Sequence, residues 1–177
     1  RMKFFKKAPE TEKIVKSLDN NNDIYLVPAF TGLGAPYWDA NARGVLSGIT
    51  RDTSPKEIVR ATIEAVAYQT FDLFEAMKHD GLRPKIVKVD GGMVMNNWFS
   101  QFLSDIVNVK VLRPKVQETT ALGAAFMAGL QIGVYKSLKD ISKNWHLDKK
   151  FSPKMKNKSR STLIKGWEKA VKRALIN

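Results

Sequence analysis

The sequence has 177 residues, of which 44% are hydrophobic and 10% aromatic, and this composition predicts one soluble globular domain. It contains no cysteine, which excludes disulfides, thiol nucleophiles and cysteine metal sites. The formal net charge is +13, but 22 of the 30 basic residues are lysine and no nucleic-acid motif is present, so we expect a solvated lysine-rich surface and no nucleic-acid partner.

The first part of the chain is polar. Residues 1–23 predict a connector that contains one short helix. No run in the sequence is apolar for long enough to insert into a membrane, and the amino terminus lacks the apolar core of a secretory signal. We therefore expect a cytoplasmic protein. Because the sequence begins with Arg1 rather than with methionine, we also expect a segment of a longer protein.

A short strand and an aromatic loop come next. Residues 24–27 predict a strand that ends at Pro28, because proline cannot donate a hydrogen bond to a neighbouring strand. Residues 29–39 are rich in glycine and aromatic side chains, a composition typical of functional loops and also of a small surface cluster. Residues 42–49 predict either a second strand or a pair of turns.

A long helix is predicted to begin after residue 54. Ser54 is a good N-cap, Pro55 suits the first helical position, and Glu57 completes a capping box. One apolar stripe is expected to face the core, formed by Val59, Ile63, Val66, Leu73 and Met77, with Arg60 and Glu64 among the charged residues on other faces.

Two polar residues interrupt this apolar pattern. Gln69 and Asp72 are able to face a binding site, but a solvated edge of the helix explains their spacing better.

The most informative stretch runs from a strand into a helix through a pair of glycines. Ile86, Val87 and Val89 are β-branched, as is typical of a buried strand. Asp90, Gly91 and Gly92 end this strand. A helix then follows, with Asn96 or Asn97 as its cap. Ligands of open α/β sheets bind at such strand ends, although the spacing alone favours a plain strand-turn-helix.

A second strand is predicted over residues 109–112, and it ends at Arg113 and Pro114. Two strands separated by one helix form a βαβ unit, whose strands should be parallel. A helix rich in small residues follows over residues 118–130, which favours tight helix packing or, alternatively, a hinge contact with a neighbouring domain. The pattern weakens over residues 138–151.

The last helix has one apolar face and one basic face. Leu163, Trp167, Ala170, Val171 and Ala174 share the apolar face, which we expect to dock on the rest of the protein. We therefore divide the chain into a connector (1–23), a domain core (24–151) and a basic C-terminal helix that packs on the same domain (152–177).

Several of these stretches resemble the C-terminal part of the glycerol kinases, a group within the FGGY family of carbohydrate kinases, which have the actin-like ATPase fold. The resemblance covers a large part of the chain and is carried by Pro28 to Asp39, Ala42 to Gly44, Arg60 to Glu64, Ala67 to Thr70, Val89 to Asn97 and Thr120 to Gly129. It implies an α/β fold of the ribonuclease H-like kind, an incomplete sheet with flanking helices.

The same resemblance implies which residues bind the cofactor. Gly92 would contact the adenine nucleotide through its bare main chain and Asn96 through its side-chain amide, while Gly91 shapes the turn. Met93 stands where the family commonly has a smaller residue. The implied cofactors are ATP or ADP with Mg²⁺, but no residue of this sequence is assigned as a metal ligand or a catalytic group. The helix over residues 119–129 resembles the segment at the interdomain hinge.

The resemblance also implies that other parts of the enzyme supply the catalytic groups. The phosphate-binding loops, the glycerol-contacting residues and the catalytic aspartate of these kinases belong to parts that this sequence does not match. Glycerol would thus be a partner only together with the N-terminal part of the same enzyme, and the complete enzyme would be a homo-oligomer. The chain is expected to be inactive in phosphoryl transfer when alone and marginally stable, since a small sheet with open edges is a poor core. An inactive nucleotide-binding or interaction module is the alternative.

Overall fold

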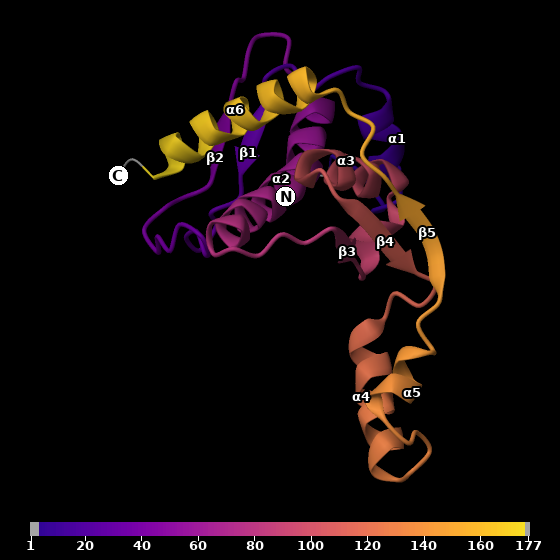
Figure 1. Ribbon diagram of the computed structural model, residues 1–177. Helices are drawn as coiled ribbons and strands as arrows, with labels where there is room; N and C mark the ends of the chain where they lie inside the picture. The colour runs from indigo at the N-terminus through magenta and orange to yellow at the C-terminus, as the bar shows by residue number, and fades with distance from the viewer. Residues whose placement is uncertain (1–3, 176–177) are drawn as a thin grey trace.

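The computed structural model describes residues 4–175, which form a body and a projecting arm (Figure 1). The body holds two small sheets and most of the helices, whereas the arm consists of α4, α5 and the segment between them. The helices are α1 (Glu10–Lys16), α2 (Pro55–His79), the 3₁₀ helix η1 (Gly92–Met95), α3 (Asn97–Val107), α4 (Thr119–Gln131), α5 (Leu138–Ser142) and α6 (Asn157–Ala174). The strands are β1 (Tyr25–Val27), β2 (Val45–Ser47), β3 (Ile86–Lys88), β4 (Lys110–Pro114) and β5 (Leu147–Phe151). Within residues 4–175, no helix has the length and apolarity needed to cross a bilayer.

The larger sheet confirms the predicted βαβ unit and adds a strand that the sequence did not predict. Its order is β3-β4-β5, with β3 and β4 parallel and joined through α3. β5 runs antiparallel to β4, with Val111 opposite Phe151. Only Phe151 is buried among the side chains of β5, so the strand has no apolar alternation. Its pairing with β4 is therefore not visible in a hydrophobic pattern.

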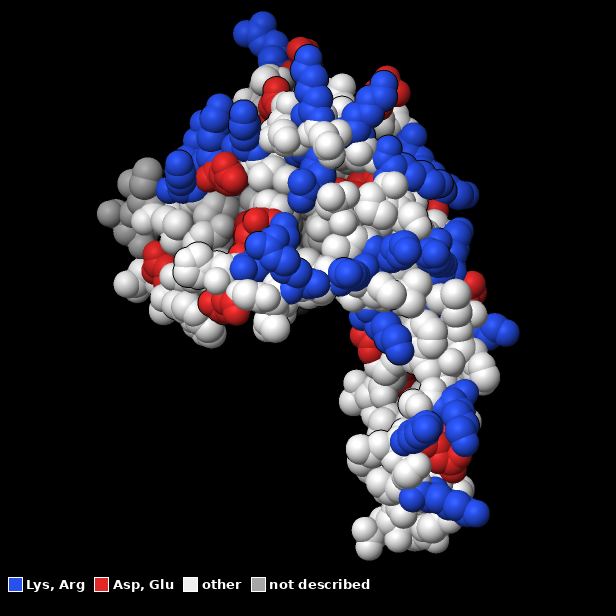
Figure 2. Space-filling view, in the orientation of Figure 1, with Lys and Arg blue, Asp and Glu red and all other residues white. Residues whose placement is uncertain are grey.

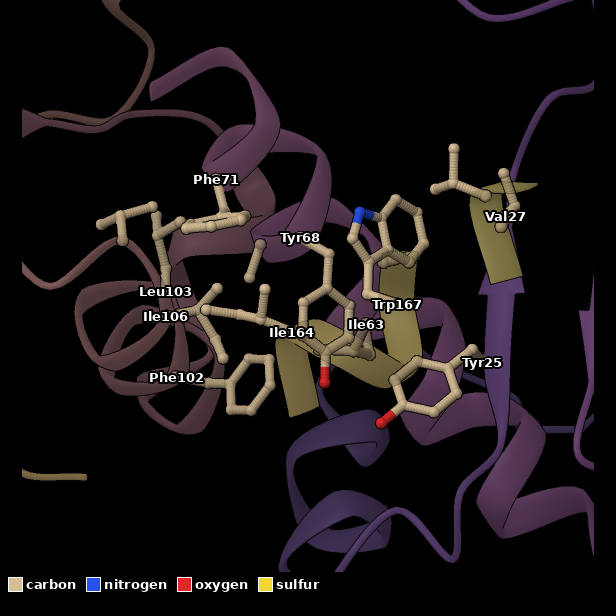
Figure 3. Close-up of a cluster of buried hydrophobic side chains, with 14 of the residues drawn as sticks. Tyr25, Val27, Ile63, Tyr68, Phe71, Phe102, Leu103, Ile106, Ile164 and Trp167 are labelled. Carbon is tan, nitrogen blue, oxygen red and sulfur yellow. The ribbon is translucent and has the colours of Figure 1, made fainter. Parts of the chain in front are cut away.

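The core of the body gathers around Tyr68 of α2 (Figure 3). The Tyr68 ring stacks on Trp167 of α6 at 5.3 Å between centroids and meets the edge of Phe102 of α3 at 5.6 Å. The ring of Tyr25 of β1 also contacts Tyr68, with 5.8 Å between the ring centroids. Four elements that are distant in sequence are therefore joined by one aromatic side chain.

Helix α2 begins as predicted, and both hydrogen bonds of the capping box are present. The predicted apolar stripe is only partly right. Val59 and Ile63 are buried, but Val66, Leu73 and Met77 are 37–39% exposed.

The predicted outward placement of Arg60 and Glu64 is wrong, because both side chains are buried. Arg60 Nε lies 2.7 Å from a Glu64 carboxylate oxygen, and the Tyr68 hydroxyl donates to the other oxygen of Glu64 at 3.1 Å. Arg60 also donates to the Leu18 carbonyl at 2.6 Å. Pairing makes burial of the two charges tolerable, and a pattern based on polarity could not anticipate it.

Asp72 is also buried, contrary to the predicted solvated edge. It is 7% exposed and accepts a hydrogen bond from the Trp167 indole N–H at 2.8 Å, which ties α6 to α2. Burial raises the pKa of Asp72 from its ordinary value to about 6, despite the lowering effect of this hydrogen bond.

The predicted apolar face of α6 is confirmed for Trp167, Ala170, Val171 and Ala174, which are at most 3% exposed. In contrast, the tight packing predicted for α4 is absent from the described residues. Gly129 is the one buried residue of α4, where a Cβ would lie 2.8 Å from the Tyr135 ring. The rest of this helix, which has no charged residue, lies against no other layer of the body.

We predict that Asp72 makes the unfolding free energy depend on pH. A carboxyl whose pKa is raised by folding binds protons more tightly in the folded state, so its stabilising contribution is complete below about pH 4 and is lost as the pH rises through about 6. Asp72→Asn keeps an acceptor for the indole N–H and removes this loss. Urea titrations should show the variant to be more stable than the parent by about 1–2 kcal/mol at pH 7.

Asp19→Asn, the same substitution at an exposed position, is measured beside Asp72→Asn as a matched control. Equal pH profiles for the parent and Asp72→Asn would contradict the assignment.

Candidate functional site

The site predicted from the glycine pair is a tight turn at the end of β3. The hydrogen bonding between β3 and β4 continues one residue beyond the end of β3, since the Val89 N–H donates to the Leu112 carbonyl at 3.1 Å. Gly91 then has φ 83° and ψ 174°, a conformation in which only glycine avoids strain. Gly92 begins the 3₁₀ helix η1, which leads directly into α3. The structure thus brings Gly91, Gly92 and Asn96 together in one turn.

Asn96 is the cap of α3, which resolves the two predicted alternatives. Its Oδ1 accepts the Phe99 main-chain N–H at 3.0 Å, and its Nδ2 lies 3.4 Å from the Thr11 hydroxyl. The long second contact leaves the amide N–H groups weakly engaged. The oxygen of the Asn96 side chain therefore caps the helix, while its amide N–H groups are able to donate a hydrogen bond to a ligand.

The main chain at the glycine pair is open to a ligand. A Cβ built on either Gly91 or Gly92 would meet no atom within 4 Å, and Gly92 is exposed. Met93 turns the other way, because its half-buried side chain packs against the hydrophobic core. The larger side chain at this position therefore leaves the face of the turn free, and a flat group is able to lie against the main chain there.

Helix α1 supports the turn from one side, a contact that the sequence did not predict. The Asn97 main-chain N–H donates to a Glu12 carboxylate oxygen at 3.2 Å, next to the contact between Asn96 and Thr11. Burial acts to raise the pKa of Glu12, but hydrogen bonds from Lys16 and from Asn97 outweigh it and hold the pKa below its ordinary value. Glu12 is thus ionised at neutral pH, and the predicted connector contains part of the support of the turn.

The opposite side of the turn is contacted from the sheet. Arg113 of β4, which the sequence marked only as the end of a strand, donates to the Val94 carbonyl at 2.7 Å. Lys149 of β5 reaches the Asn97 side chain at 3.0 Å. Neither contact had a signal in the sequence, because the partners lie 19 and 52 residues apart.

The arm begins beside the same turn. The Gly91 N–H donates to the carbonyl of Gln117 at 3.2 Å, two residues before α4. A cavity of about 260 Å³ lies where α4 and α5 meet the end of the sheet, and it is lined by Lys88, Leu122, Phe126 and Trp145 among others. A displacement of α4 would therefore act on the backbone of the glycine turn.

A larger hollow lies elsewhere. It measures about 1070 Å³ and is lined by Asn21, Arg60, Trp98 and Lys158 among others, but by neither glycine of the turn nor by Asn96. The smaller cavity beside the arm is likewise lined by none of these three residues. Residues 4–175 also contain no group of three or more histidine, aspartate or glutamate side chains placed to hold a metal ion.

Comparison with known proteins identifies relatives along almost the whole chain. Residues 4–132 match the C-terminal domain of the FGGY family of carbohydrate kinases. Glycerol kinase 1 of Pseudomonas aeruginosa is 54% identical over 172 residues, and a glycerol kinase of Clostridium botulinum is 50% identical over 175. These matches cover 97% and 98% of this chain, but the chain spans only 35% of the length of either relative.

Solved structures give the same result. The crystal structure of Plasmodium falciparum glycerol kinase with ADP superimposes with a TM-score of 0.85 and 37% identity, covering 99% of this chain and 35% of that one. A ligand-bound xylulose kinase from Lactobacillus acidophilus superimposes with a TM-score of 0.76 and 25% identity, over 98% of this chain and 36% of that one. The α/β fold is therefore that of the actin-like kinases, as predicted.

We predict that the two glycines differ in what they do for the fold. Gly91→Ala places a residue with a Cβ in a backbone conformation that only glycine adopts without strain. It should lower the unfolding free energy by about 1–3 kcal/mol. Gly92→Ala has open space and no positive φ, and should leave stability unchanged within about 0.5 kcal/mol. Denaturant titration of both variants beside the parent measures the difference. Equal losses would contradict the described turn.

Proposed function

The chain belongs to the FGGY family of carbohydrate kinases, and from this membership we propose that it is the C-terminal, nucleotide-binding portion of an ATP-dependent glycerol kinase. The complete enzyme would convert ATP and glycerol to ADP and glycerol 3-phosphate. The observation that carries the proposal is the open glycine turn, where the main chain of Gly91 and Gly92 has free space and Asn96 caps the helix that follows. The 54% identity to a glycerol kinase supports the choice of glycerol among the sugars and polyols that the family phosphorylates.

The residues of the turn suit an adenine nucleotide. A bare main chain at Gly91 and Gly92 accepts the flat face of a purine, and the weakly engaged amide of Asn96 is able to donate to a nitrogen or oxygen acceptor. Mg²⁺ would accompany ATP or ADP through the phosphates, as is usual in phosphoryl transfer. When bound, ATP supplies the transferable phosphoryl group. This chain holds and orients the adenosine end.

The remaining machinery would come from the N-terminal part of the same enzyme. Phosphoryl transfer needs groups that position the γ-phosphate and a carboxylate near the acceptor hydroxyl, and no residue of this chain is assigned to either task. We propose that the glycerol site, the phosphate loops and the catalytic carboxylate are all supplied in this way, and that the complete enzyme is a cytoplasmic homo-oligomer.

Three uncovered surfaces support a missing partner. β3 lies at the edge of its sheet, with Ile86 51% exposed. Val66, Leu73 and Met77 of α2 are exposed. α4 has no charged residue, so the charged side chains that Figure 2 shows on the arm belong to its other segments, and Met127 of α4 is 51% exposed. Open strand edges and apolar helix faces of this kind are usually covered by further structure.

We predict saturable binding of MgADP by the chain, measured by calorimetric titration. Gly92→Val should abolish it, because the added side chain occupies the open face of the turn. Asn96→Asp is the sharper second variant, since it retains the oxygen that caps α3 and removes the amide donors. It should weaken binding by about tenfold or more while the helix content stays unchanged.

An unaltered affinity in both variants would place the nucleotide elsewhere and contradict the proposal. Failure of a well-folded parent to bind would favour the alternative, an inactive interaction module, over a nucleotide-binding portion.

We predict activity from a chimaera in which these 177 residues replace the matching segment of the P. aeruginosa glycerol kinase 1. The chimaera should phosphorylate glycerol with MgATP, and the same protein carrying Gly92→Val should lose at least about 2 kcal/mol of transition-state stabilisation in kcat/KM for ATP. A coupled assay of ADP release measures both. A folded chimaera without activity would argue against a kinase segment.

A further inference from the structure

Arg113 is the buried cation closest to the glycine turn, and its position in the sheet is unusual for an arginine. It lies on β4 between Leu112 and Pro114 and is 6% exposed. A buried guanidinium is stable only when its N–H groups are paired. Its contacts therefore show which segments it holds together.

Most of the acceptors around Arg113 belong to the turn. Its Nη1 donates to the Val94 carbonyl at 2.7 Å and to the Met95 carbonyl at 3.3 Å, and its Nη2 lies 3.4 Å from the side-chain oxygen of Asn97. Val94 and Met95 are the last residues of η1, where carbonyl groups lack partners within the helix. A cation at this end of a helical turn is favourable.

The guanidinium is itself fixed by β5. Its Nε donates to Asp148 at 2.7 Å, and the Phe151 ring lies 5.6 Å from the Arg113 Cζ. Pairing with Asp148 neutralises the buried charge and orients the planar fork, so that its other N–H groups point at the turn. On the far side, Glu12 of α1 accepts the Asn97 main-chain N–H. The segment between Gly92 and Asn97 is thus held from two sides by charged groups.

We infer that Arg113 is a positioning residue for nucleotide binding. It fixes η1 so that the bare main chain of Gly92 and the side-chain amide of Asn96 share one orientation before the nucleotide arrives. The inference rests on the proposed function for the identity of the ligand, but the fixing of the turn by Arg113 is independent of it. A preorganised site loses less entropy on binding, so loss of this residue should weaken affinity without removing any group that touches the ligand.

The test compares Arg113→Met with Arg160→Met. Arg160 is a matched control, because it too donates to a main-chain carbonyl, that of Ile106 at 2.7 Å, and lies over a phenylalanine ring, that of Phe71 at 5.4 Å. Hydrogen exchange is measured without nucleotide for the peptide over residues 92–100, and the Kd for MgADP is measured by calorimetry. Arg113→Lys serves as the conservative variant, since it keeps the positive charge and removes the planar fork of donors that bonds Val94 and Asp148 together.

We expect exchange in the 92–100 peptide to be about tenfold faster in Arg113→Met, and the Kd for MgADP to rise by about tenfold. Arg160→Met should change neither quantity beyond twofold, even where it lowers the melting temperature as much. Arg113→Lys should lie between the parent and Arg113→Met. If Arg113→Met does not fold, Asp148→Asn takes its place, because it frees the guanidinium while keeping its donors.

Two results would overturn the inference. One is an unchanged exchange rate over residues 92–100 in Arg113→Met. The other is an equal acceleration in Arg160→Met, which would mean general loosening. A parent that binds no MgADP would contradict the proposed function instead, and the exchange rates would still decide whether Arg113 holds the turn.

Discussion

The packing around Tyr68 is the constraint on which the rest of the structure depends. Its ring contacts Trp167, Phe102 and Tyr25, and so it joins α6, α3 and β1 to α2 (Figure 3). Because α3 is held on α2 in this way, the first turn of α3 and the glycine turn before it have a fixed place at the surface. The hydroxyl of Tyr68 meets the buried pair of Arg60 and Glu64, which makes the same residue a centre of both apolar and polar contacts.

From this centre the support of the candidate site extends outwards in two directions. α1 packs on α2 and α3 and presents Thr11 and Glu12 to the turn, while β4 and β5 present Arg113 and Asp148. The turn is therefore held from its flanks, while a Cβ at Gly91 or Gly92 would meet no atom within 4 Å among the described residues. The edge strand β3 and the uncharged helix α4 are open surfaces of a chain that spans 35% of the length of its relatives.

Local patterns in the sequence predicted what depends on neighbouring residues. The capping box of α2, the parallel strands around α3 and the turn at the glycine pair were all predicted correctly. The family resemblance predicted the fold, whereas the roles of Gly91, Gly92 and Asn96 toward a nucleotide stay predictions. What failed depends on the burial of paired charges and on contacts that are distant in sequence.

The failures share a physical cause. Arg60, Glu64 and Asp72 are charged residues that the fold buries by pairing, and a polarity pattern assigns such residues to the surface. β5 buries one side chain and so has no alternation to detect. Arg113 acquires its contacts only when β5 and η1 come together, which no local pattern encodes.

The most direct test of the central claim, that the turn receives an adenine nucleotide, is an NMR titration of the isotope-labelled chain with MgADP. We expect saturable shifts of the amide signals from Gly91 to Ser100, with smaller changes at Gln117, whose carbonyl is bound to the turn. Saturable shifts confined to residues around the hollow of about 1070 Å³, such as Asn21 and Lys158, would contradict the claim and place the nucleotide in that hollow.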